Sequence, residues 1–464
     1  MPRTDAARAL VAVLLLAACD SLAPDYAPPT MEVGSSFKES GLWRVAGRDV
    51  PPAGKWWALF GDPVLNGLEE RIEAANPALA AAAARYRQAD AILRHNRADE
   101  LPEIDLGGGL SRSRVSAARP LTNGRAETYH DVTLGASLSY EVDLFGRVAS
   151  AVAAGEANAV AAKSDLAGVR LGLQTRLAGL YFDLRGLDAR IALLGETVEA
   201  YRRAYDLTDT RHGDGIASGL DLSRARTQLA SARAELETVA AQRDRTEHAI
   251  AALLGEVPSR FSIAASATEL SPPPIPAGVP SALLERRPDI AAAERRVAAA
   301  NAEIGVARAA MYPRVTLGLT GGFETIYGNL LDASNGVWSL GPLAVNFPLF
   351  DHGARQANLD LARARYEEIV AAYRQTVLTA FREVEDDLVT ARHAVEQERN
   401  QREAAAAARV ALDLALTRYR DGAADYLQVV TAQTTALDAE RTLLDLHSQQ
   451  LHVATDTVRA LGGL

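Results

Sequence analysis

The chain carries one sequence pattern twice, and this duplication limits the folds open to it. Asn76-Pro77 begins an alanine-rich stretch that ends at Leu101-Pro102, and Arg287-Pro288 begins a second that ends at Tyr312-Pro313. The prolines of each stretch lie 25 residues apart, at 77 and 102 and at 288 and 313, and the copies are offset by 211 positions. Two such copies predict a duplicated structural unit.

The segments that follow the two stretches also match. His212-Gly213-Asp214-Gly215 pairs with Tyr419-Arg420-Asp421-Gly422, and each copy reads as two alternating strands, a very long helix and a return helix. We therefore expect a signal peptide at 1–18, a tether and N-terminal segment at 19–61, a first repeat at 62–264, a linker at 265–287 and a second repeat at 288–464. The first repeat should hold strands near 103–114 and 131–144 and helices at 77–99, 147–211 and 220–254. The second should hold strands near 314–324 and 337–350 and helices at 288–311, 353–420 and 427–461.

Alternating apolar residues define the predicted strands. Every second residue from Val132 to Val142 is apolar, and the residues between them are mostly small or polar. One face of this strand therefore meets an apolar phase and the other meets water or a small-residue lining. A half-buried strand of a soluble sandwich would show the same alternation.

Four strands of about ten residues cannot close a barrel, because about eight strands are the practical minimum. Their edges need partners, which other copies of the chain can supply. Three copies would provide about twelve strands, enough for an open lumen, and ten tilted residues match the length of a transmembrane strand. The strands thus predict a membrane β-barrel that several copies of the chain complete, with four strands from each chain.

The predicted long helices carry a seven-residue repeat. Between 147 and 209 there is no proline, and an apolar residue recurs at Val152, Ala159, Leu166, Leu173, Leu180, Leu187, Leu194 and Tyr201. This spacing predicts a rod of ~90 Å that coils around its return helix. A plain antiparallel coiled coil would satisfy one such seam. Alanine, serine and threonine on the neighbouring faces favour further sideways packing, as an α-helical barrel requires.

The N-terminus has the pattern of a bacterial lipoprotein signal. Arg3 and Arg8 precede an apolar segment at 9–18 that is too short to span a bilayer. Leu16-Ala17-Ala18-Cys19 resembles a lipobox, which would make Cys19 the lipidated N-terminus. An ordinary signal peptide with an incidental cysteine is the alternative. Asp20 follows the cysteine, and in enteric bacteria an acid there favours inner-membrane retention.

Composition and spacing argue against several functions. The net charge is −10 without a compensating basic cluster, which argues against nucleic acid. Cys19 is the only cysteine and no His-Glu-x-x-His pattern occurs, so we expect no metal, no cofactor and no enzyme. The acidic run at Glu383, Glu385, Asp386 and Asp387 reads as a solvated or duct-lining face. No segment reaches about 18 consecutive apolar residues, so no transmembrane helix is expected.

Several motifs resemble the outer-membrane efflux factor family, the TolC- and OprM-like tunnel proteins and their NodT-type lipoprotein members. The best match runs from Leu283-Leu284-Glu285-Arg286-Arg287-Pro288-Asp289-Ile290 to Tyr312-Pro313. Trp56-Trp57, Phe60-Gly61-Asp62-Pro63, Arg418-Tyr419-Arg420 with Gly422, and Leu461-Gly462-Gly463 also fit. The resemblance covers essentially all of the mature chain.

The resemblance implies a lipid-anchored homotrimer of the outer membrane that extends into the periplasm. It would receive substrate from an inner-membrane RND-type pump through a periplasmic adaptor, or membrane fusion protein, and would do no chemistry itself. Two alternatives remain open. One is the outer-membrane component of a type I protein secretion system, and the other is a lipid-anchored periplasmic coiled-coil adaptor. An adaptor should have one hairpin and a lipoyl-like β domain, and neither feature is seen.

The resemblance also implies a gate at the periplasmic mouth. Leu427 and Thr431, one helical turn apart, would face the axis, while Arg418 and Tyr419 would tie the hairpins together in the closed state. Relatives often have an acid at the position of Thr431, so we expect Leu427 to act here as an apolar plug. The adaptor would contact the hairpin tips at Gly213, Gly215, Gly219, Gly422 and Asp425.

Overall fold

The structure is a computed structural model that describes residues 21–31, 34, 36–39, 54–118, 124–267, 270–273, 280–326 and 328–463. The predicted signal peptide at 1–18, Cys19 and Asp20 lie outside the described residues, as do parts of the predicted tether and linker. Chain contacts define two compact units. The strand unit comprises Ala84–Lys163, Ala292–Arg374 and the N-terminal segment up to Met31, and the hairpin unit comprises Glu32–Ala83, Ser164–Ala291 and Gln375–Leu464. Each unit therefore takes residues from both predicted repeats.

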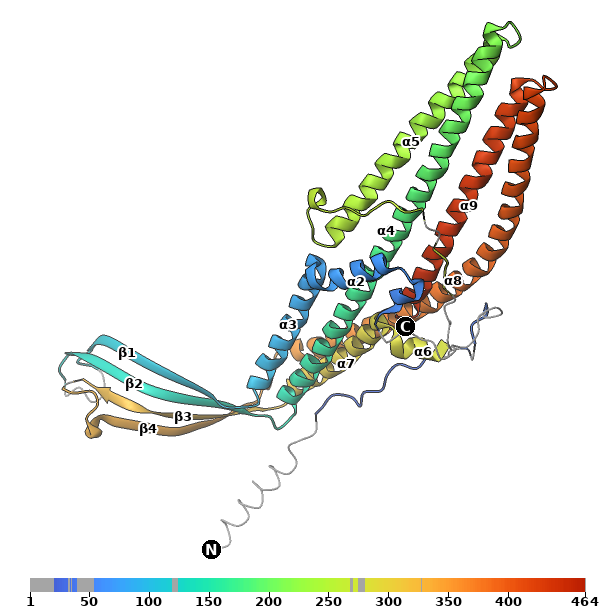
Figure 1. Cartoon of the computed structure of the whole chain (residues 1–464). Coiled ribbons are helices and arrows are strands. Elements are labelled where there is room, and N and C mark those ends of the chain that lie inside the picture. Colours follow the sequence, from blue (N-terminus) through green and yellow to red (C-terminus); the bar gives the residue numbers. More distant parts are fainter. Residues whose placement is uncertain are drawn as a thin grey trace. The chain divides into compact units, whose positions relative to one another are not determined.

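The strand unit contains one antiparallel sheet of four strands in the order β1-β2-β3-β4 (Figure 1). The strands are β1 (Glu103–Val115), β2 (Glu127–Val142), β3 (Arg314–Thr325) and β4 (Gly336–Asn346). The β2–β3 ladder, which runs from Val132 opposite Thr325 to Val142 opposite Val315, joins the strand pair of one repeat to that of the other. Periodicity within each strand did not predict this pairing.

Two strand boundaries differ from the sequence prediction. The strand expected at 131–144 begins at Glu127, because Glu127 pairs with Val115, and it ends at Val142. The strand expected at 337–350 ends at Asn346, which pairs with Arg314 at the start of β3. Beyond that point β3 offers no further partner, and Pro348 lacks the N–H that a ladder needs.

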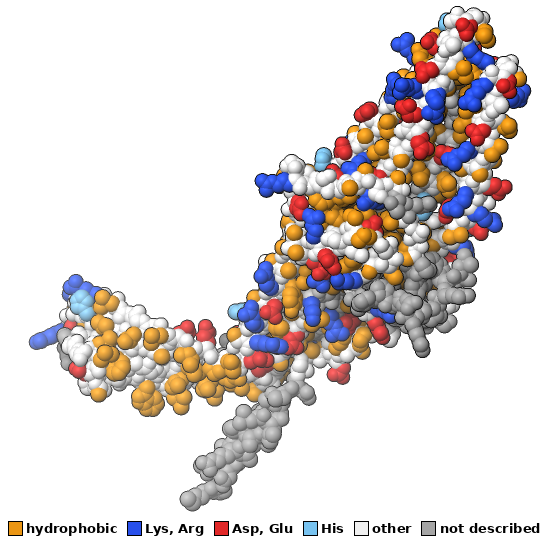
Figure 2. All heavy atoms as spheres, viewed as in Figure 1, with side chains coloured by type: hydrophobic (Ala, Val, Ile, Leu, Met, Phe, Trp, Pro, Cys, Tyr) orange, Lys and Arg blue, Asp and Glu red, His pale blue; other side chains and the backbone are white. Residues whose placement is uncertain are grey.

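One face of the sheet is apolar across all four strands. The register sets Leu106 opposite Ala136, Leu138 opposite Leu319, and Leu317 opposite Leu343. Large side chains on this side of the edge strands are more than 60% exposed, among them Ile104, Leu106, Leu110, Trp338, Leu340 and Leu343. Figure 2 shows hydrophobic side chains gathered over the strands. A contiguous apolar face of this kind requires an apolar environment.

The helices repeat the duplication in their lengths. The long helices α4 (Arg147–Gly213) and α8 (Ala354–Arg420) have 67 residues each, and the return helices α5 (Gly219–Leu253) and α9 (Tyr426–Ala460) have 35 each. The α4–α5 and α8–α9 pairs are the two hairpins (Figure 1). The remaining helices are η2 (Trp56–Phe60), α2 (Pro63–Ala75), α3 (Pro77–Ala98), η3 (Pro258–Arg260), α6 (Pro280–Arg286), α7 (Pro288–Ala309) and η4 (Ala333–Asn335). Among the described residues, no helix is both long enough and apolar enough to cross a membrane.

Side-chain caps fix the starts of the short helices. Asp62 accepts hydrogen bonds from the N–H groups of Val64 and Leu65 at 2.7 and 3.1 Å, and Pro63 takes the first helical position of α2. Asn76 does the same for the second and third residues of α3, after Pro77. Proline suits the first position because its fixed φ is helical and its missing N–H would have no partner there.

Aromatic packing anchors the segment before α2. Trp56 and Trp57 of η2 are buried, and the Phe60 ring lies 4.7 Å, centroid to centroid, from the ring of Phe182 on α4. Such pairs contribute roughly 0.5–1.5 kcal/mol beyond the area they bury. The Trp-Trp and Phe-Gly-Asp-Pro motifs therefore dock η2 and α2 onto the long helix of the hairpin unit.

Glu69 of α2 is buried without a partner. Its side chain has no exposed surface, and within the described residues neither carboxylate oxygen has a hydrogen bond. Burial, and secondarily the Glu73 carboxylate, raise the pKa of Glu69 to about 9. The side chain is therefore a neutral carboxylic acid at pH 7, since a buried unpaired charge is far more costly.

The Glu69 proton should make stability depend on pH. The folded chain keeps this proton up to about pH 9, whereas a free glutamic acid releases it near 4.5, so stability falls as pH rises between these values. Glu69→Gln removes the titration and keeps the shape. The wild-type chain should lose about 1.4 kcal/mol of stability for each pH unit above 4.5. At pH 7 we therefore expect the variant to be about 3 kcal/mol per chain more stable than the wild type, and below pH 4.5 the two should be equally stable. Thermal unfolding in detergent across this pH range measures it, and parallel pH profiles of variant and wild type would contradict it.

Candidate functional site

The two hairpins end in the same turn. After α4, Gly215 has φ +74°, and the Ile216 N–H donates to the Arg211 carbonyl at 2.8 Å. After α8, Gly422 also has φ +74°, and the Ala423 N–H donates to the Arg418 carbonyl at 2.8 Å. These hydrogen bonds to the last helical turn terminate both long helices. Only glycine adopts such a φ without strain.

The predicted tip residues have different roles in these turns. Gly213 is the last residue of α4 and Gly219 is the first of α5, and neither has a positive φ. In the first tip, Gly215 makes the left-handed bend between these two helix ends. Asp425 is the N-cap of α9, where its side chain accepts a hydrogen bond from the Gln428 N–H at 3.1 Å.

Tyr419 joins the two hairpins within the chain. Its ring is only 5% exposed and packs edge-on against Tyr426, with ring centroids 5.4 Å apart. Its hydroxyl lies 3.1 Å from the Thr208 hydroxyl on α4. A buried ring cannot also line an opening in this state. Of the predicted gate residues, Tyr419 is therefore a contact between hairpins rather than part of a pore wall.

Arg211 of α4 completes this contact, and sequence reasoning missed it. Its guanidinium lies 4.8 Å from the centre of the Tyr419 ring and donates to the Tyr419 and Arg420 carbonyls at 2.6 and 2.7 Å. A cation that binds the last carbonyls of α8 neutralises the negative end of that helix. The duplication held the signal, because Arg211 is the first-repeat counterpart of Arg418, 207 positions earlier.

The other predicted gate residues are exposed. Leu427 is 47% exposed. Thr431 lies one turn further along α9, and its hydroxyl donates to the Leu427 carbonyl at 2.9 Å. Arg418 is exposed, and within the described residues its guanidinium has no hydrogen-bond or ion-pair partner. The surfaces of these exposed residues remain free for another chain.

Further polar contacts join α9 to the first hairpin. His452 hydrogen-bonds Asp183 of α4 at 2.7 Å, and this contact raises the pKa of His452. Arg441 forms an ion pair with Glu235 of α5 at 2.8 Å, and Gln228 donates to Thr434 at 3.3 Å. A contact near the base and several toward the tip therefore hold α9 beside α4 and α5.

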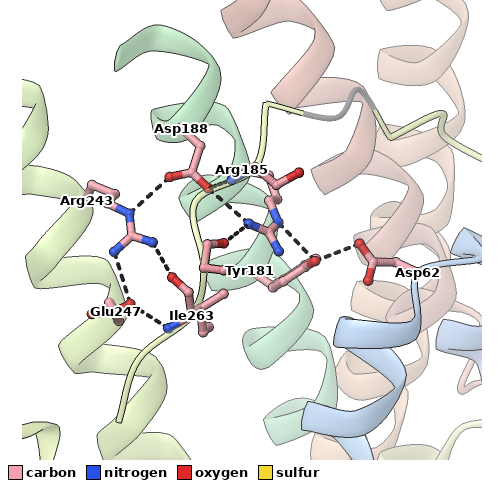
Figure 3. Close-up of polar contacts among 9 residues, drawn as sticks. Asp62, Tyr181, Arg185, Asp188, Arg243, Glu247 and Ile263 are labelled. Atoms are coloured by element: carbon pink, nitrogen blue, oxygen red, sulfur yellow. Dashed lines mark hydrogen bonds and ion pairs between the residues drawn. The ribbon is translucent and has the colours of Figure 1, made fainter. Parts of the chain in front are cut away.

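A buried ion network fastens the segment after α5 (Figure 3). The Asp188 carboxylate accepts hydrogen bonds from Arg185 and Arg243 and from the Ser266 N–H, each at 3.0 Å. Arg185 and Arg243 also donate to the carbonyls of Ala264 and Ile263, at 2.8 and 2.6 Å. Arginines on two helices thus clamp the start of the predicted linker.

The same network reaches the start of α2. The Tyr181 hydroxyl donates to Asp62 at 2.6 Å and accepts from Arg185 at 3.0 Å (Figure 3). Asp62 therefore caps α2 with one carboxylate oxygen and binds α4 with the other. In the described part of the chain, no group of three or more His, Cys, Asp or Glu residues could hold a metal ion.

Known proteins match both halves of this arrangement. The sequence model of the family described as "Outer membrane efflux protein" matches residues 68–256 and 279–463. Outer membrane protein OprJ of Pseudomonas aeruginosa is 34% identical and covers 98% of this chain and 95% of its own length. Cation efflux system protein CusC of Escherichia coli K12 is 30% identical, with 97% of each chain covered. The solved outer-membrane channel OprN superposes with a TM-score of 0.89 at 30% identity, covering 96% of this chain and 99% of its own.

Proposed function

This chain belongs to the outer membrane efflux protein family, and we propose that it is the exit duct through which a tripartite efflux system empties across the outer membrane. The family consists of channels, so the chain is not an enzyme. Its partners are of the kinds such systems contain, an inner-membrane pump and a periplasmic adaptor. The finer proposal is an RND-type pump and a homotrimeric duct.

The four-stranded sheet carries the trimer proposal. Within the described residues β1 and β4 are edge strands with no further neighbour, and the apolar side chains of the sheet are exposed. An unpaired edge of 11 to 13 residues and an uncovered apolar face are both strongly disfavoured in water. Three copies joined edge to edge in a bilayer would remove both features at once, in a barrel of about twelve strands.

The N-terminal segment supports a lipid anchor at Cys19. In the strand unit, Arg308 donates to the Leu22 carbonyl at 3.1 Å and Asn301 donates to the Pro24 carbonyl at 2.7 Å. Arg308 is one residue from the end of α7 and six residues before β3 begins. Cys19 lies three residues before Leu22, so an acyl chain on it would start near the base of the sheet, at the membrane surface of a spanning barrel.

The tips and the exposed gate residues support a periplasmic mouth. Next to the predicted contact residue Gly215, the first tip exposes Ile216 at 70% and Leu220 at 60%. We assign these apolar tips to the adaptor. Leu427 and Thr431 on the second hairpin form the constriction in the trimer, and the free Arg418 side chain binds the neighbouring chain in the closed state.

Mass and conductance together test the duct. Native mass spectrometry in detergent should give three chains, and planar bilayers should show ion current. Gly322→Val is the matched negative control, because a Cβ at Gly322 would overlap the Leu134 carbonyl and the Cα of Gly135 and so break the β2–β3 ladder. This variant should lose current while its helices stay folded. A folded wild-type chain that is monomeric and non-conducting would overturn the proposal.

A further inference from the structure

The helical part of the strand unit contains one hollow of about 600 Å³ that four helices line. Its polar and charged lining residues are Asn96, Asn158, Glu303, Asn358 and Arg365. Asn96 lies on α3, Asn158 on α4 and Glu303 on α7, and both Asn358 and Arg365 lie on α8. The remaining lining side chains are apolar and mostly small, so the hollow is wide and its polar groups reach solvent.

The four helices form a row, and the hollow lies on one side of it. Leu93 of α3 packs in one buried cluster with Val148 of α4. A Cβ on Gly305 of α7 would meet the Ser150 side chain of α4, so these two helices also lie against each other. The chain passes from α7 into β3 and from β4 into α8, and Arg314 at the start of β3 pairs with Asn346 at the end of β4, which brings the adjoining ends of α7 and α8 together.

The order is therefore α3, α4, α7, α8, yet residues of both outer helices line the same hollow. A row of helices brings its two ends to a common space only on its concave side. The hollow thus marks the inside of a curved wall.

The N-terminal segment identifies the outside of this wall. Asn301 and Arg308 of α7 bind that segment, whereas Glu303 and Ala307 line the hollow. At about 100° per residue these two pairs are centred about 130° apart around α7 and so lie on different faces of it. The segment that leads to the proposed lipid anchor therefore runs along a side of α7 that faces away from the hollow.

The duplication gives the same direction independently. Glu303 is the counterpart of Ile92, 211 positions earlier, and Arg365 is the counterpart of Asn158, 207 positions earlier, and all four line the hollow. Equivalent side chains of two repeats that are related by rotation converge only toward the rotation axis. The inner side of the wall is therefore the side that faces the axis.

We propose that this hollow is part of the inner wall of the duct, and that Glu303 and Arg365 are the charged residues that act there on permeating solutes. The inference rests on the proposed channel function and adds the residues that determine its selectivity. Both side chains are exposed, and among the described residues neither has a hydrogen-bond or ion-pair partner. Their charges are therefore available to the lumen. Screening limits the reach of each charge to about 8 Å at physiological salt, so each residue acts on solutes that pass close to it.

Thiol labelling of the assembled trimer tests which face lines the duct. Arg363 is the matched control for Arg365, because it lies two residues away on α8, points about 200° around the helix and pairs with Asp360 on an exposed face. In Arg365→Cys, a small charged thiosulfonate should react and a polyethylene-glycol maleimide too wide for the duct should not. In Arg363→Cys both reagents should react. The inference is overturned if the wide reagent labels position 365, or if neither reagent labels it.

Reversal potentials in a salt gradient test the charge assignment. Arg365→Gln should shift the reversal potential toward the cation equilibrium potential, Glu303→Gln toward that of the anion, and Arg363→Gln should leave it unchanged. Absent or inverted shifts in a conducting trimer would overturn this inference and leave the proposed function standing. A wild-type chain that neither trimerises nor conducts would instead overturn the proposed function.

Discussion

Asp188→Ala should lower the free energy of unfolding by about 3–5 kcal/mol, because it leaves the buried Arg185 without a carboxylate partner and Arg243 with Glu247 alone. The Arg185 and Asp188 side chains are 8% and 2% exposed, and Arg243 is 13% exposed. Arg185 would keep only the Tyr181 hydroxyl and the Ala264 carbonyl, whereas Arg243 would keep Glu247 and the Ile263 carbonyl. The Ser266 N–H would also lose its acceptor. Thermal unfolding of the purified protein in detergent measures the loss.

The control for Asp188→Ala is Asp206→Ala on the same helix. Asp206 is exposed, and within the described residues its carboxylate has no partner. Its removal should change stability by less than about 0.5 kcal/mol. Asp188→Asn should fall between the two, since the amide keeps the shape and loses the charge. Equal unfolding temperatures for Asp188→Ala and Asp206→Ala would mean that water already screens the network and that it does not fasten the segment after α5.

The sequence predicted the elements well because their signals are local. Proline at the first helical position, the seven-residue spacing from Val152 to Tyr201 and the alternation from Val132 to Val142 each act within a few turns or one strand. These signals do not contain the partner of an element. The β2–β3 ladder joins residues that lie between 173 and 193 positions apart (Val142 with Val315 and Val132 with Thr325), and the end of β4 depends on where β3 begins.

The site was less predictable for the same reason. Tyr419 was expected to tie the hairpins together, but its partners Thr208 and Arg211 on α4 lie more than 200 positions away, and no residue near Tyr419 indicates them. Asp188 and Arg185 form a visible pair three residues apart, whereas Arg243 joins them from another helix 55 positions away. Among the sequence signals, only the duplication relates residues that are far apart in the chain. It relates Arg211 to Arg418 and Leu220 to Leu427.

Leu427→Ala combined with Arg418→Ala should raise the conductance of the trimer several-fold in planar bilayers. The truncation at Leu427 widens an apolar constriction and lets water enter it, since hydrophobic constrictions close pores by dewetting. Loss of the Arg418 guanidinium removes a free cation at the end of α8, which we expect to hold the neighbouring chain as Arg211 holds α8 within the chain. Each change alone should have a smaller effect, because the other residue still keeps the mouth closed.

Leu220→Ala separates a gate on the second hairpin from general loosening of the tips. Leu220 is the first-repeat counterpart of Leu427 and is also exposed, at 60% against 47%. If only the second hairpin closes the mouth, Leu220→Ala should leave the conductance at the wild-type level while Leu427→Ala raises it. Equal increases would place both hairpins at the constriction. If the double variant at Leu427 and Arg418 has wild-type conductance, these two residues do not form the gate, and other residues must restrict the duct.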